Sequence, residues 1–372
     1  MTKNNTKKII FRLAELFSGP GGLALGAVSS SVLDKGGRYY GIESVWANDI
    51  DQNSCNTYTK NIHNGKKGFA ICKPVEKIDF SKTPFFDALA FGFPCNDFSL
   101  VGEQKGFNGK YGPLYTYGVK AINAHRPKWF IAENVSGLRS ANNGEAFKAI
   151  LNDLQNAGNG YNITAHLYKF EEYGVPQTRH RIVIVGIRKD LGFKFKVPAP
   201  TTRNKYVSAR KAIETPPIPK DAPNNEQTKQ SKLVIERLKY IPPGENAWYE
   251  GIPENLRLNV KKTRMSQIYK RLHPDKPSYT ITGSGGGGTH GYHWEENRAL
   301  TNRERARIQT FPDTFIFEGN KESVRKQIGM AVPPKGAQEI ITAVLKTFAN
   351  IPYETVKETI ENGAEESQKC LF

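Results

Sequence analysis

Apolar runs of strand length recur along the first half of the chain, and each is closed by glycine, proline or polar residues. Between them lie stretches whose apolar residues have helical spacing. Strands that are apolar throughout and alternate with helices are typical of a sheet covered by helices on both faces. The sequence therefore predicts an α/β fold with a doubly wound sheet. The predicted strands are Ile9–Ser18, Tyr39–Val45, Phe85–Gly92, Lys128–Ala132 and Ile182–Ile187.

Helix signals fill the intervals between these runs. Residues 145–157 place four apolar side chains on one helical face, and Gly158 ends the pattern. Arg298–Gln309 predicts a helix capped by Thr301, with Glu304 three residues further on. Further helices are expected after residue 22, near Gln52, over Tyr115–Ala124 and after Pro334.

A glycine turn, Gly19-Pro20-Gly21-Gly22, joins the first strand to its helix. A strand, a glycine turn and a helix form a nucleotide-binding opening, because glycines let backbone N–H groups approach a ligand. A tight turn with nothing bound would look the same. The second strand leads to Asp49 and Asp51, and an acid there can accept hydrogen bonds from ribose hydroxyls. The sequence leaves open which of the two does so and which caps the following helix.

A cysteine follows the third strand in Pro94-Cys95, where proline stiffens its approach. Such a cysteine is most often a small buried hydrophobe, so its assignment depends on its neighbours. Glu133 and Asn134 close the fourth strand, and the carboxyl ends of parallel strands meet at the edge where open α/β sheets bind ligands. We therefore expect these side chains to lie near Cys95.

Two further segments are expected to lie at this edge of the sheet. Residues 100–117 are glycine-punctuated and polar, which predicts a mobile lid after the cysteine rather than a strand. Arg179 and Arg181 enter the fifth strand at i and i+2, so they share one face and can reach one anion or base.

The charge of the chain indicates a polyanionic partner. The net charge is +17, and the isoelectric point is about 9.5, which favours nucleic acid. Residues 189–280 hold 19 Lys and Arg against 9 Asp and Glu, and 11 of the 22 prolines. A basic, proline-rich segment with weak periodicity predicts a separate binding module. We expect residues 1–188 to form the catalytic domain, 189–280 the module, 281–350 a return to the first domain and 351–372 a charged tail. The tail is expected to fray from Tyr353.

The four cysteines, Cys55, Cys72, Cys95 and Cys370, have no paired spacing. This argues against disulfide and zinc frameworks and favours a reducing cytoplasm. No run of eighteen apolar residues occurs, which argues against a membrane span, and the polar amino terminus does not have the pattern of a secretory signal.

Six motifs, in order, resemble those of the cytosine-5 DNA methyltransferases. Residues 17–22, Phe-Ser-Gly-Pro-Gly-Gly, are similar to that family's cofactor-binding Phe-x-Gly-x-Gly-Gly, and Pro94-Cys95 to its catalytic Pro-Cys. The other four are Glu133-Asn134-Val135, Gln177-x-Arg179-x-Arg181, the helix from Arg298, and Gly329 with Pro333-Pro334. The resemblance covers nearly the whole chain except the basic segment and the tail.

The resemblance implies a Rossmann-like methyltransferase sheet with a smaller, irregular target-recognition domain. The implied reaction transfers a methyl group from S-adenosylmethionine, without a metal, to carbon-5 of a cytosine flipped out of a specific duplex DNA sequence. Cys95 would add to carbon-6 of the base, because carbon-5 is otherwise too weak a nucleophile. Glu133 would hold the ring nitrogen and share a proton with it, which burial favours.

The remaining roles are also implied by the resemblance. Asn134 would fix the loop geometry, Arg181 would lie near the base carbonyl oxygen, and Arg179 near the base or an adjoining phosphate. Both arginines are candidates for stabilising the Cys95 thiolate. The implied cofactor-binding residues are Phe17, Gly19, Gly21, Gly22, Leu23, Asp49, Ile50, Pro94, Leu114 and Ala331.

Three positions depart from the family pattern. Asn96 replaces the usual Gln after Pro-Cys, and Met330 replaces the usual Asn after Gly329. Lys73–Glu76 lacks the usual Asp-Ile, so the polar partner of the adenine stays unassigned. We also expect Asp97 to point away from Cys95, because its charge would oppose the thiolate.

Three rival functions are weighed on the sequence. An RNA cytosine-5 methyltransferase of the transfer-RNA branch would carry a Cys-Phe-Thr signature, but no cysteine occurs between Cys95 and Cys370. Intact Cys95 and Glu133 argue against an inactive DNA-binding relative. A nicotinamide-dependent oxidoreductase explains only the glycine turn.

The expected partner is double-stranded DNA. We expect a monomer on the nucleoid in a bacterial cytoplasm. A restriction endonuclease would act on the same DNA sequence without forming a stable complex with this protein.

Overall fold

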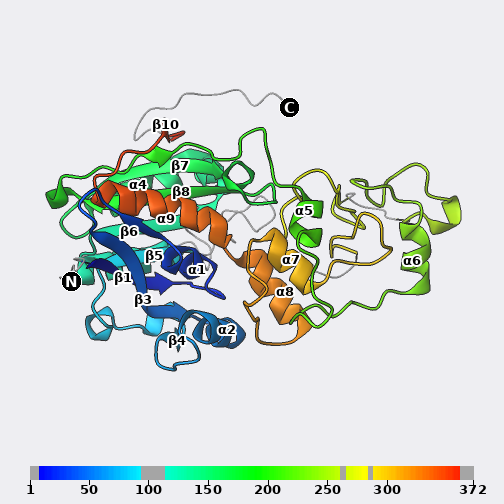
Figure 1. Ribbon diagram of the computed structural model, residues 1–372, viewed down its shortest axis with the longest axis horizontal. Coiled ribbons are helices and arrows are strands. Elements are labelled where there is room, and N and C mark those ends of the chain that lie inside the picture. The colour runs from blue at the N-terminus through cyan, green and yellow to red at the C-terminus, as the bar shows by residue number, and fades with distance from the viewer. Residues whose placement is uncertain (1–7, 94–113, 260–264, 284–287, 361–372) are drawn as a thin grey trace, which may run out of the picture.

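The computed structural model describes residues 8–93, 114–259, 265–283 and 288–360, and these form two lobes (Figure 1). One lobe is built around a sheet and holds the first half of the chain together with α9 (Pro334–Phe348). The other consists of short helices joined by long irregular segments and lies beyond the N-terminal end of α9. Within the described residues, every helix is too short or too polar to traverse a bilayer.

Eight strands of the described residues form one mixed sheet, which confirms the predicted α/β fold. The strands β3, β1, β5 and β6 are parallel, whereas β8 runs antiparallel to both of its neighbours, β6 and β7. The order across the sheet is β2 (Ser31–Leu33), β3 (Tyr39–Asp49), β1 (Lys8–Leu16), β5 (Ala88–Gly92), β6 (Trp129–Val135), β8 (His180–Arg188) and β7 (Tyr161–Lys169), with β4 (Ala70–Cys72) also paired to β3.

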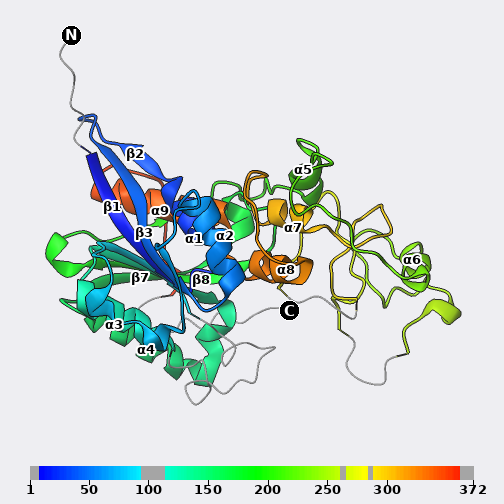
Figure 2. The same cartoon turned by 90° about the horizontal axis from the view of Figure 1, so that it is seen from below.

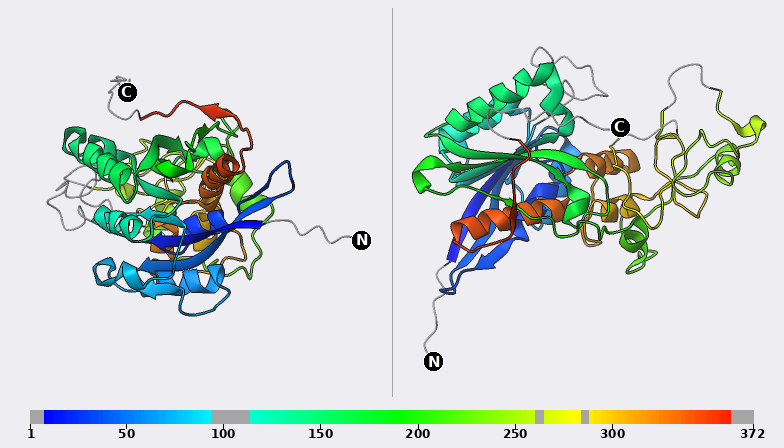
Figure 3. Two further views of the ribbon diagram at one scale, coloured as in Figure 1. Left: turned by 90° about the vertical axis from the view of Figure 1, so that its left-hand side faces the viewer. Right: turned by 90° about the horizontal axis from the view of Figure 1, so that it is seen from above.

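Helices cover both faces of this sheet (Figures 2 and 3). One face carries α3 (Tyr115–His125) and α4 (Glu145–Asn156), and the other carries α1 (Gly22–Val28) and α9. The helix α2 (Gln52–Ile62) packs beside β3 and β4. The four apolar residues predicted to share one face of α4 are buried in the core, as their spacing predicts.

Glycines allow α1 and the segment before α9 to approach closely. A Cβ at Gly22 would lie 2.2 Å from the carbonyl oxygen of Val332, and a Cβ at Gly26 would lie 2.4 Å from that of Pro334. Only glycine leaves room for this contact, which lays residues 331–337 directly against the start of α1. The chain therefore returns from the second lobe to the glycine turn.

The described part of the second lobe has its own apolar clusters and four short α-helices. The capping box predicted for Thr301 and Glu304 is present, with both reciprocal hydrogen bonds. The fully buried Arg303 donates to the carbonyl oxygens of Pro223, Pro312 and Phe315 and so ties its helix to the basic segment. The helices are α5 (Ala209–Glu214), α6 (Lys232–Leu238), α7 (Asn302–Ile308) and α8 (Lys321–Met330).

These clusters do not stop at residue 280, where the sequence placed the end of the module. Ala209, Ile213 and Leu272 share one cluster with residues 294–331, and Leu238 shares another with Tyr292. The segment between residues 288 and 331 thus packs with the basic segment, and the chain rejoins the sheet at α9.

The tail was expected to fray from Tyr353, and for residues 353–360 this prediction is wrong. Thr355–Val356 forms β10, which pairs antiparallel with β9 (Val197–Pro198). Ile360 is buried among the core residues that cover the α3 and α4 face of the sheet. Burial of the apolar Ile360 side chain in the core outweighs the tendency of the charged residues around it to stay in water.

We predict that Ile360→Ala lowers the free energy of unfolding by about 2–4 kcal/mol, since it leaves a cavity in a packed core. Urea denaturation followed by circular dichroism measures this change. Glu354→Ala is the matched control, because its side chain is exposed in the same segment. Equal midpoints for the two variants would contradict the anchoring role of Ile360.

Candidate active site

The glycine turn is held against the end of β3 by two hydrogen bonds. The backbone N–H of Ser18 donates to the carbonyl oxygen of Asn48, and that of Gly19 donates to Asp49 Oδ2 at 2.8 Å. Phe17 and Gly19 both have φ of +54°, which lets the chain turn sharply out of β1. The turn therefore stands at the carboxyl edge of the sheet, beside the end of β3.

The two aspartates that the sequence left open have different partners. Asp51 caps α2, because its side chain accepts the backbone N–H of Ser54. Asp49 accepts N–H groups from Gly19 and Asp51, and burial raises its pKa. Asp49 is therefore the acid at the glycine turn, and its contact with a ribose stays a prediction.

The surroundings of the turn suit a polar ligand such as a nucleoside. The hydroxyl of Ser18 is buried without a hydrogen-bond partner among the described residues. A Cβ at Gly19 would meet no heavy atom of the described residues within 4 Å, so these residues leave the space beside the turn open. Ser18 was not among the sequence candidates, although its hydroxyl lies inside the glycine motif.

Several other predicted cofactor residues gather around the same turn. The Cβ of Ala331 would lie 3.3 Å from a Cβ at Gly22. Leu23 is buried, whereas Ile50 is 70% exposed next to Asp49. Leu114 lies instead in the core cluster that also contains Phe93.

Of the two single residues that depart from the family pattern, Met330 belongs to the described residues and Asn96 does not. Met330 is 66% exposed, and its Cγ would lie 3.3 Å from a Cβ at Gly283. Pro94, Cys95, Asn96 and Asp97, with most of the predicted lid, lie outside the described residues.

Asn134 holds the backbone immediately before Pro94-Cys95. Its Nδ2 donates to the carbonyl oxygen of Phe93 at 3.1 Å, and its Oδ1 accepts the backbone N–H of Val135. The side chain is buried, so the amide bridges the ends of β5 and β6 without exposure to water. This is the contact expected of a residue that fixes the geometry of the loop.

Glu133 and Arg181 form an ion pair at the same edge. Arg181 Nε lies 2.9 Å from Glu133 Oε1, and each side chain is 13% exposed. Because β8 is antiparallel to β6, its first residues lie opposite the end of β6, where Arg181 pairs with Val135. The carboxylate lies over the end of β5, with Oε2 3.2 Å from the position of a Cβ at Gly92. The sequence analysis predicted that Glu133 shares a proton with the base, but it did not predict the ion pair with Arg181.

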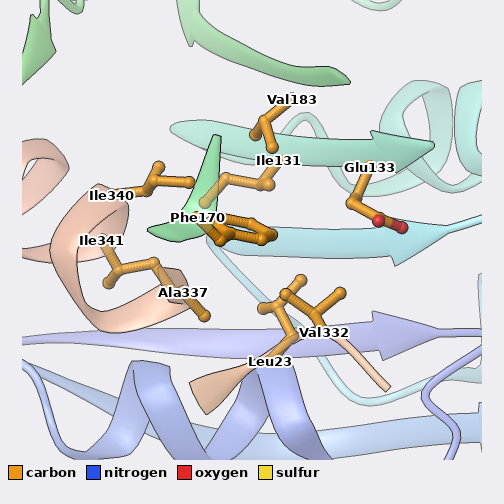
Figure 4. Close-up of a pocket in the computed structure, with 9 residues that line it drawn as sticks. All are labelled: Leu23, Ile131, Glu133, Phe170, Val183, Val332, Ala337, Ile340 and Ile341. Carbon is orange, nitrogen blue, oxygen red and sulfur yellow. The ribbon is translucent and has the colours of Figure 1, made fainter. Parts of the chain in front are cut away.

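Figure 4 shows an apolar pocket behind this carboxylate. Glu133 lies at one end and is the only charged residue among the described residues that line it. Ile340 and Ile341 of α9 lie at the other end. Leu23 and Val332 complete the wall nearest the glycine turn. The acid therefore lies between an apolar interior and the edge of the sheet.

The structure places Arg179 differently from the sequence prediction. Only Arg181 belongs to β8, and Arg179 precedes it, buried with 2% exposure. The Arg179 guanidinium donates to the carbonyl oxygens of Ile281, Gly329 and Ala331 at 3.0–3.2 Å. A guanidinium committed to backbone inside the protein is not positioned to reach a base or a phosphate. It joins the sheet lobe to two segments of the second lobe.

Two glutamines complete this junction. Gln177 donates to Gln309 at 2.9 Å and accepts the backbone N–H of Ile281 at 2.8 Å. Gln309 in turn donates to the carbonyl oxygen of Ile328. Both side chains are fully buried, so the first and second lobes meet at a polar contact that excludes water.

Comparison with known proteins decides the family. The family described as C-5 cytosine-specific DNA methylase matches residues 11–346. The chain belongs to this family. The resemblance in the motifs is thereby confirmed, and the activity is that of a DNA (cytosine-5-)-methyltransferase. Dependence on S-adenosylmethionine is implied by the family.

Individual relatives cover nearly the whole methyltransferase. It is 60% identical to the type II methyltransferase M.BbvI of Brevibacillus brevis over 352 residues, 93% of this chain and 94% of the relative. It is 42% identical to the type II methyltransferase M.NgoFVII of Neisseria gonorrhoeae, over 97% of this chain and 92% of the relative. A crystal structure of a prophage-encoded protein of E. coli superposes with a TM-score of 0.65 and 22% sequence identity, covering 91% of this chain and 99% of that protein. This similarity supports the fold alone.

We predict opposite outcomes for the two arginines of the Gln-x-Arg-x-Arg motif. Arg179→Lys should lower the free energy of unfolding by about 2–4 kcal/mol, because an ammonium cannot serve three carbonyl oxygens in this geometry and leaves buried acceptors unpaired. Arg181→Lys should leave stability nearly unchanged and lower kcat, because its pair with Glu133 lies at the edge of the sheet, where each side chain is 13% exposed.

Thermal denaturation and single-turnover methylation of duplex DNA measure the two effects, with each variant as the control for the other. A stable, slow Arg179→Lys enzyme would reverse the assignment and place that guanidinium in the chemistry.

Proposed function

We propose that this chain is the modification methyltransferase of a type II restriction-modification system. It transfers a methyl group from S-adenosylmethionine to carbon-5 of one cytosine in a specific duplex DNA sequence. The main structural support for this activity is that the Glu133–Arg181 pair, the Asn134 bridge and the glycine turn all lie at one edge of the sheet. The 60% identity with the type II methyltransferase M.BbvI supports the biological setting.

The cofactor is proposed to bind along the glycine turn. The backbone of Gly19 and Gly21, the N–H groups of Gly22 and Leu23, the Ser18 hydroxyl and the Asp49 carboxyl would hold its polar parts. Phe17, Ile50 and Ala331 would hold its apolar parts. The open space at Gly19 and the unpartnered Ser18 hydroxyl support this placement. When bound, S-adenosylmethionine supplies an electrophilic methyl group on a sulfonium.

Cys95 is proposed as the nucleophile on the basis of the sequence motif. Its thiolate would add to carbon-6 of the cytosine, and the electrons displaced onto the ring would make carbon-5 nucleophilic. After methylation, loss of the carbon-5 proton to a base and cleavage of the carbon–sulfur bond would restore the aromatic ring and the thiolate. Asn134 would keep the backbone before Cys95 in place through the Phe93 carbonyl.

Glu133 is proposed to hold the ring nitrogen of the target base. Arg181 binds one carboxylate oxygen, which fixes the orientation of the carboxylate and leaves the other oxygen next to the end of β5. The guanidinium is also proposed to reach the base carbonyl oxygen. Flipping the base costs a few kcal/mol, which contacts between the DNA and the positively charged protein would offset.

The second lobe is proposed to read the DNA sequence. Its basic segment, residues 189–280, holds an excess of ten positive charges, and phosphate contacts follow from such charge. The enzyme is proposed to act as a monomer in the bacterial cytoplasm. A restriction endonuclease with the same target would share the site rather than bind this protein.

We predict that Cys95→Ser lowers the single-turnover rate at least about 10³-fold, since a hydroxyl is a far weaker nucleophile than a thiolate. Binding of duplex DNA, measured by fluorescence anisotropy, should change less than about threefold. A duplex carrying 5-fluorocytosine at the target should form a covalent adduct with the wild-type enzyme and methyl donor, but not with the variant. Full turnover by the variant would remove Cys95 from the mechanism.

We further predict that expression in a host without cytosine methylation marks one short DNA sequence with 5-methylcytosine. Bisulfite sequencing of the host genome reports the sequence, and the purified enzyme should methylate duplex DNA but not transfer RNA. Labelling of transfer RNA alone would favour the rival RNA activity.

A further inference from the structure

A buried carboxyl that the methyl-transfer chemistry does not use lies beneath the glycine turn. Glu15 is in β1, two residues before Phe17, and its side chain is buried with 3% exposure. The hydroxyl of Tyr58 donates to Glu15 Oε2 at 3.2 Å. The backbone N–H of Ala24, in the first turn of α1, donates to the same carboxyl. A charged residue type inside an otherwise apolar strand is the sequence signal for this position.

The carboxyl and the glycine turn form one packed unit. The Tyr58 ring lies against Gly21, where a Cβ would be only 2.9 Å from Tyr58 Cδ2. Tyr58 is also hydrogen-bonded to Ser44 at 3.0 Å, and Ser44 to His63 Nε2 at 3.3 Å. A change of charge on Glu15 is therefore felt at the turn through the start of α1 and through this ring.

The groups facing Glu15 provide no cation. They are the Tyr58 hydroxyl from α2, the Asp49 carboxyl from β3 and the Ala24 amide from α1. In the described part of the chain, no Lys or Arg side chain pairs with Glu15 or Asp49. Burial lowers the pKa of His63, so that more distant group is neutral at neutral pH. Burial raises the pKa of Glu15 to about 8, and the nearby Asp49 adds to the shift.

We propose that Glu15 is a proton-linked positioning residue of the cofactor site, which holds a proton in the free enzyme and releases it when a sulfonium cofactor occupies the glycine turn. This inference rests on the proposed binding of S-adenosylmethionine. The neutral acid becomes a carboxylate, and its proton goes to solvent. Positive charge near a buried carboxyl favours the ionised form.

The consequence is discrimination between the methyl donor and the demethylated product. S-adenosylmethionine carries a positive sulfur, whereas S-adenosylhomocysteine is a neutral thioether. Only the donor would draw the proton from Glu15. Loss of the positive charge on methyl transfer would let the carboxyl take up a proton again, which weakens its hold on the product.

Isothermal titration calorimetry of the wild-type enzyme tests this coupling. Titrations at pH 7 in phosphate and in Tris give the number of protons released, because the two buffers differ in ionisation enthalpy. We expect close to one proton per S-adenosylmethionine and much less for S-adenosylhomocysteine. The affinity ratio of donor to product should rise about tenfold between pH 7 and pH 9, because the ionised fraction of Glu15 in the free enzyme rises about tenfold over that range when its pKa is about 8. The sulfonium lowers the pKa of the donor's own amino group, so the two ligands differ in that titration as well. Glu15→Gln keeps the ligand titration and is therefore its control.

Two variants locate the proton. Glu15→Gln should abolish the buffer dependence for S-adenosylmethionine and flatten the affinity ratio across pH. Tyr58→Phe removes the neighbouring hydroxyl but keeps the carboxyl, so it should still release the proton.

Folding of the variants is checked by the pH dependence of Tm. A carboxyl whose folded pKa lies above its unfolded value binds more protons in the folded state, so wild-type Tm should fall as pH rises from 5 to 8. That fall should be smaller in Glu15→Gln.

The outcomes separate this inference from the proposed function. Tight donor binding with no proton release, or release that persists in Glu15→Gln, would overturn the inference and leave the function intact. Absence of any donor binding by the wild-type enzyme would overturn both.

Discussion

The buried guanidinium of Arg179 is the contact on which the relation between the two lobes depends. A cation withdrawn from water needs hydrogen-bond acceptors, and here the backbone carbonyls of Ile281, Gly329 and Ala331 accept from the two terminal nitrogens of the guanidinium. Those carbonyls belong to segments about 100 and 150 residues away from Arg179 in the sequence. The same contact that fixes the second lobe also presents Ala331 to Gly22 and so completes the wall of the glycine turn.

Strand direction sets the chemistry at the edge of the sheet. Parallel β1, β3, β5 and β6 bring the glycine turn, Asp49, Phe93 and Glu133 to one side. The antiparallel β8 delivers Arg181 from the opposite direction to the same place, opposite the end of β6. A parallel strand at this position would have put its first residues at the far edge, away from Glu133.

The carboxyls of this edge differ in their environments. Glu133 is paired with a guanidinium and borders an apolar pocket, whereas Glu15 and Asp49 are buried near the glycine turn with neutral donors. Low-dielectric surroundings make an unpaired carboxylate costly and sensitive to any cation that arrives. This edge thus combines an acid compensated by a guanidinium with uncompensated acids beside the glycine turn.

The sequence by itself determined five strands, β1, β3, β5, β6 and β8, together with the helices of the sheet lobe and the order of the strand-end motifs. Apolar periodicity and glycine or proline breaks are local properties. It did not predict β2, β4 or β7, which complete the sheet. It also pointed to Cys95, Glu133 and the glycine turn, since their residue types match one chemistry. Only the tertiary structure decided that Arg179 binds backbone while Arg181 binds Glu133. Two arginines at i and i+2 look alike in sequence, and their partners lie far along the chain.

The same limit applies at the domain boundary and the tail. Composition separates the basic segment at residue 280, but apolar clusters join it to residues 288–331, and Ile360 finds a place in the core. Such contacts depend on where distant segments come together, which periodicity does not encode. Asp49 and Asp51 could each serve the turn by spacing, and only the hydrogen bonds of Gly19 and Ser54 distinguish them.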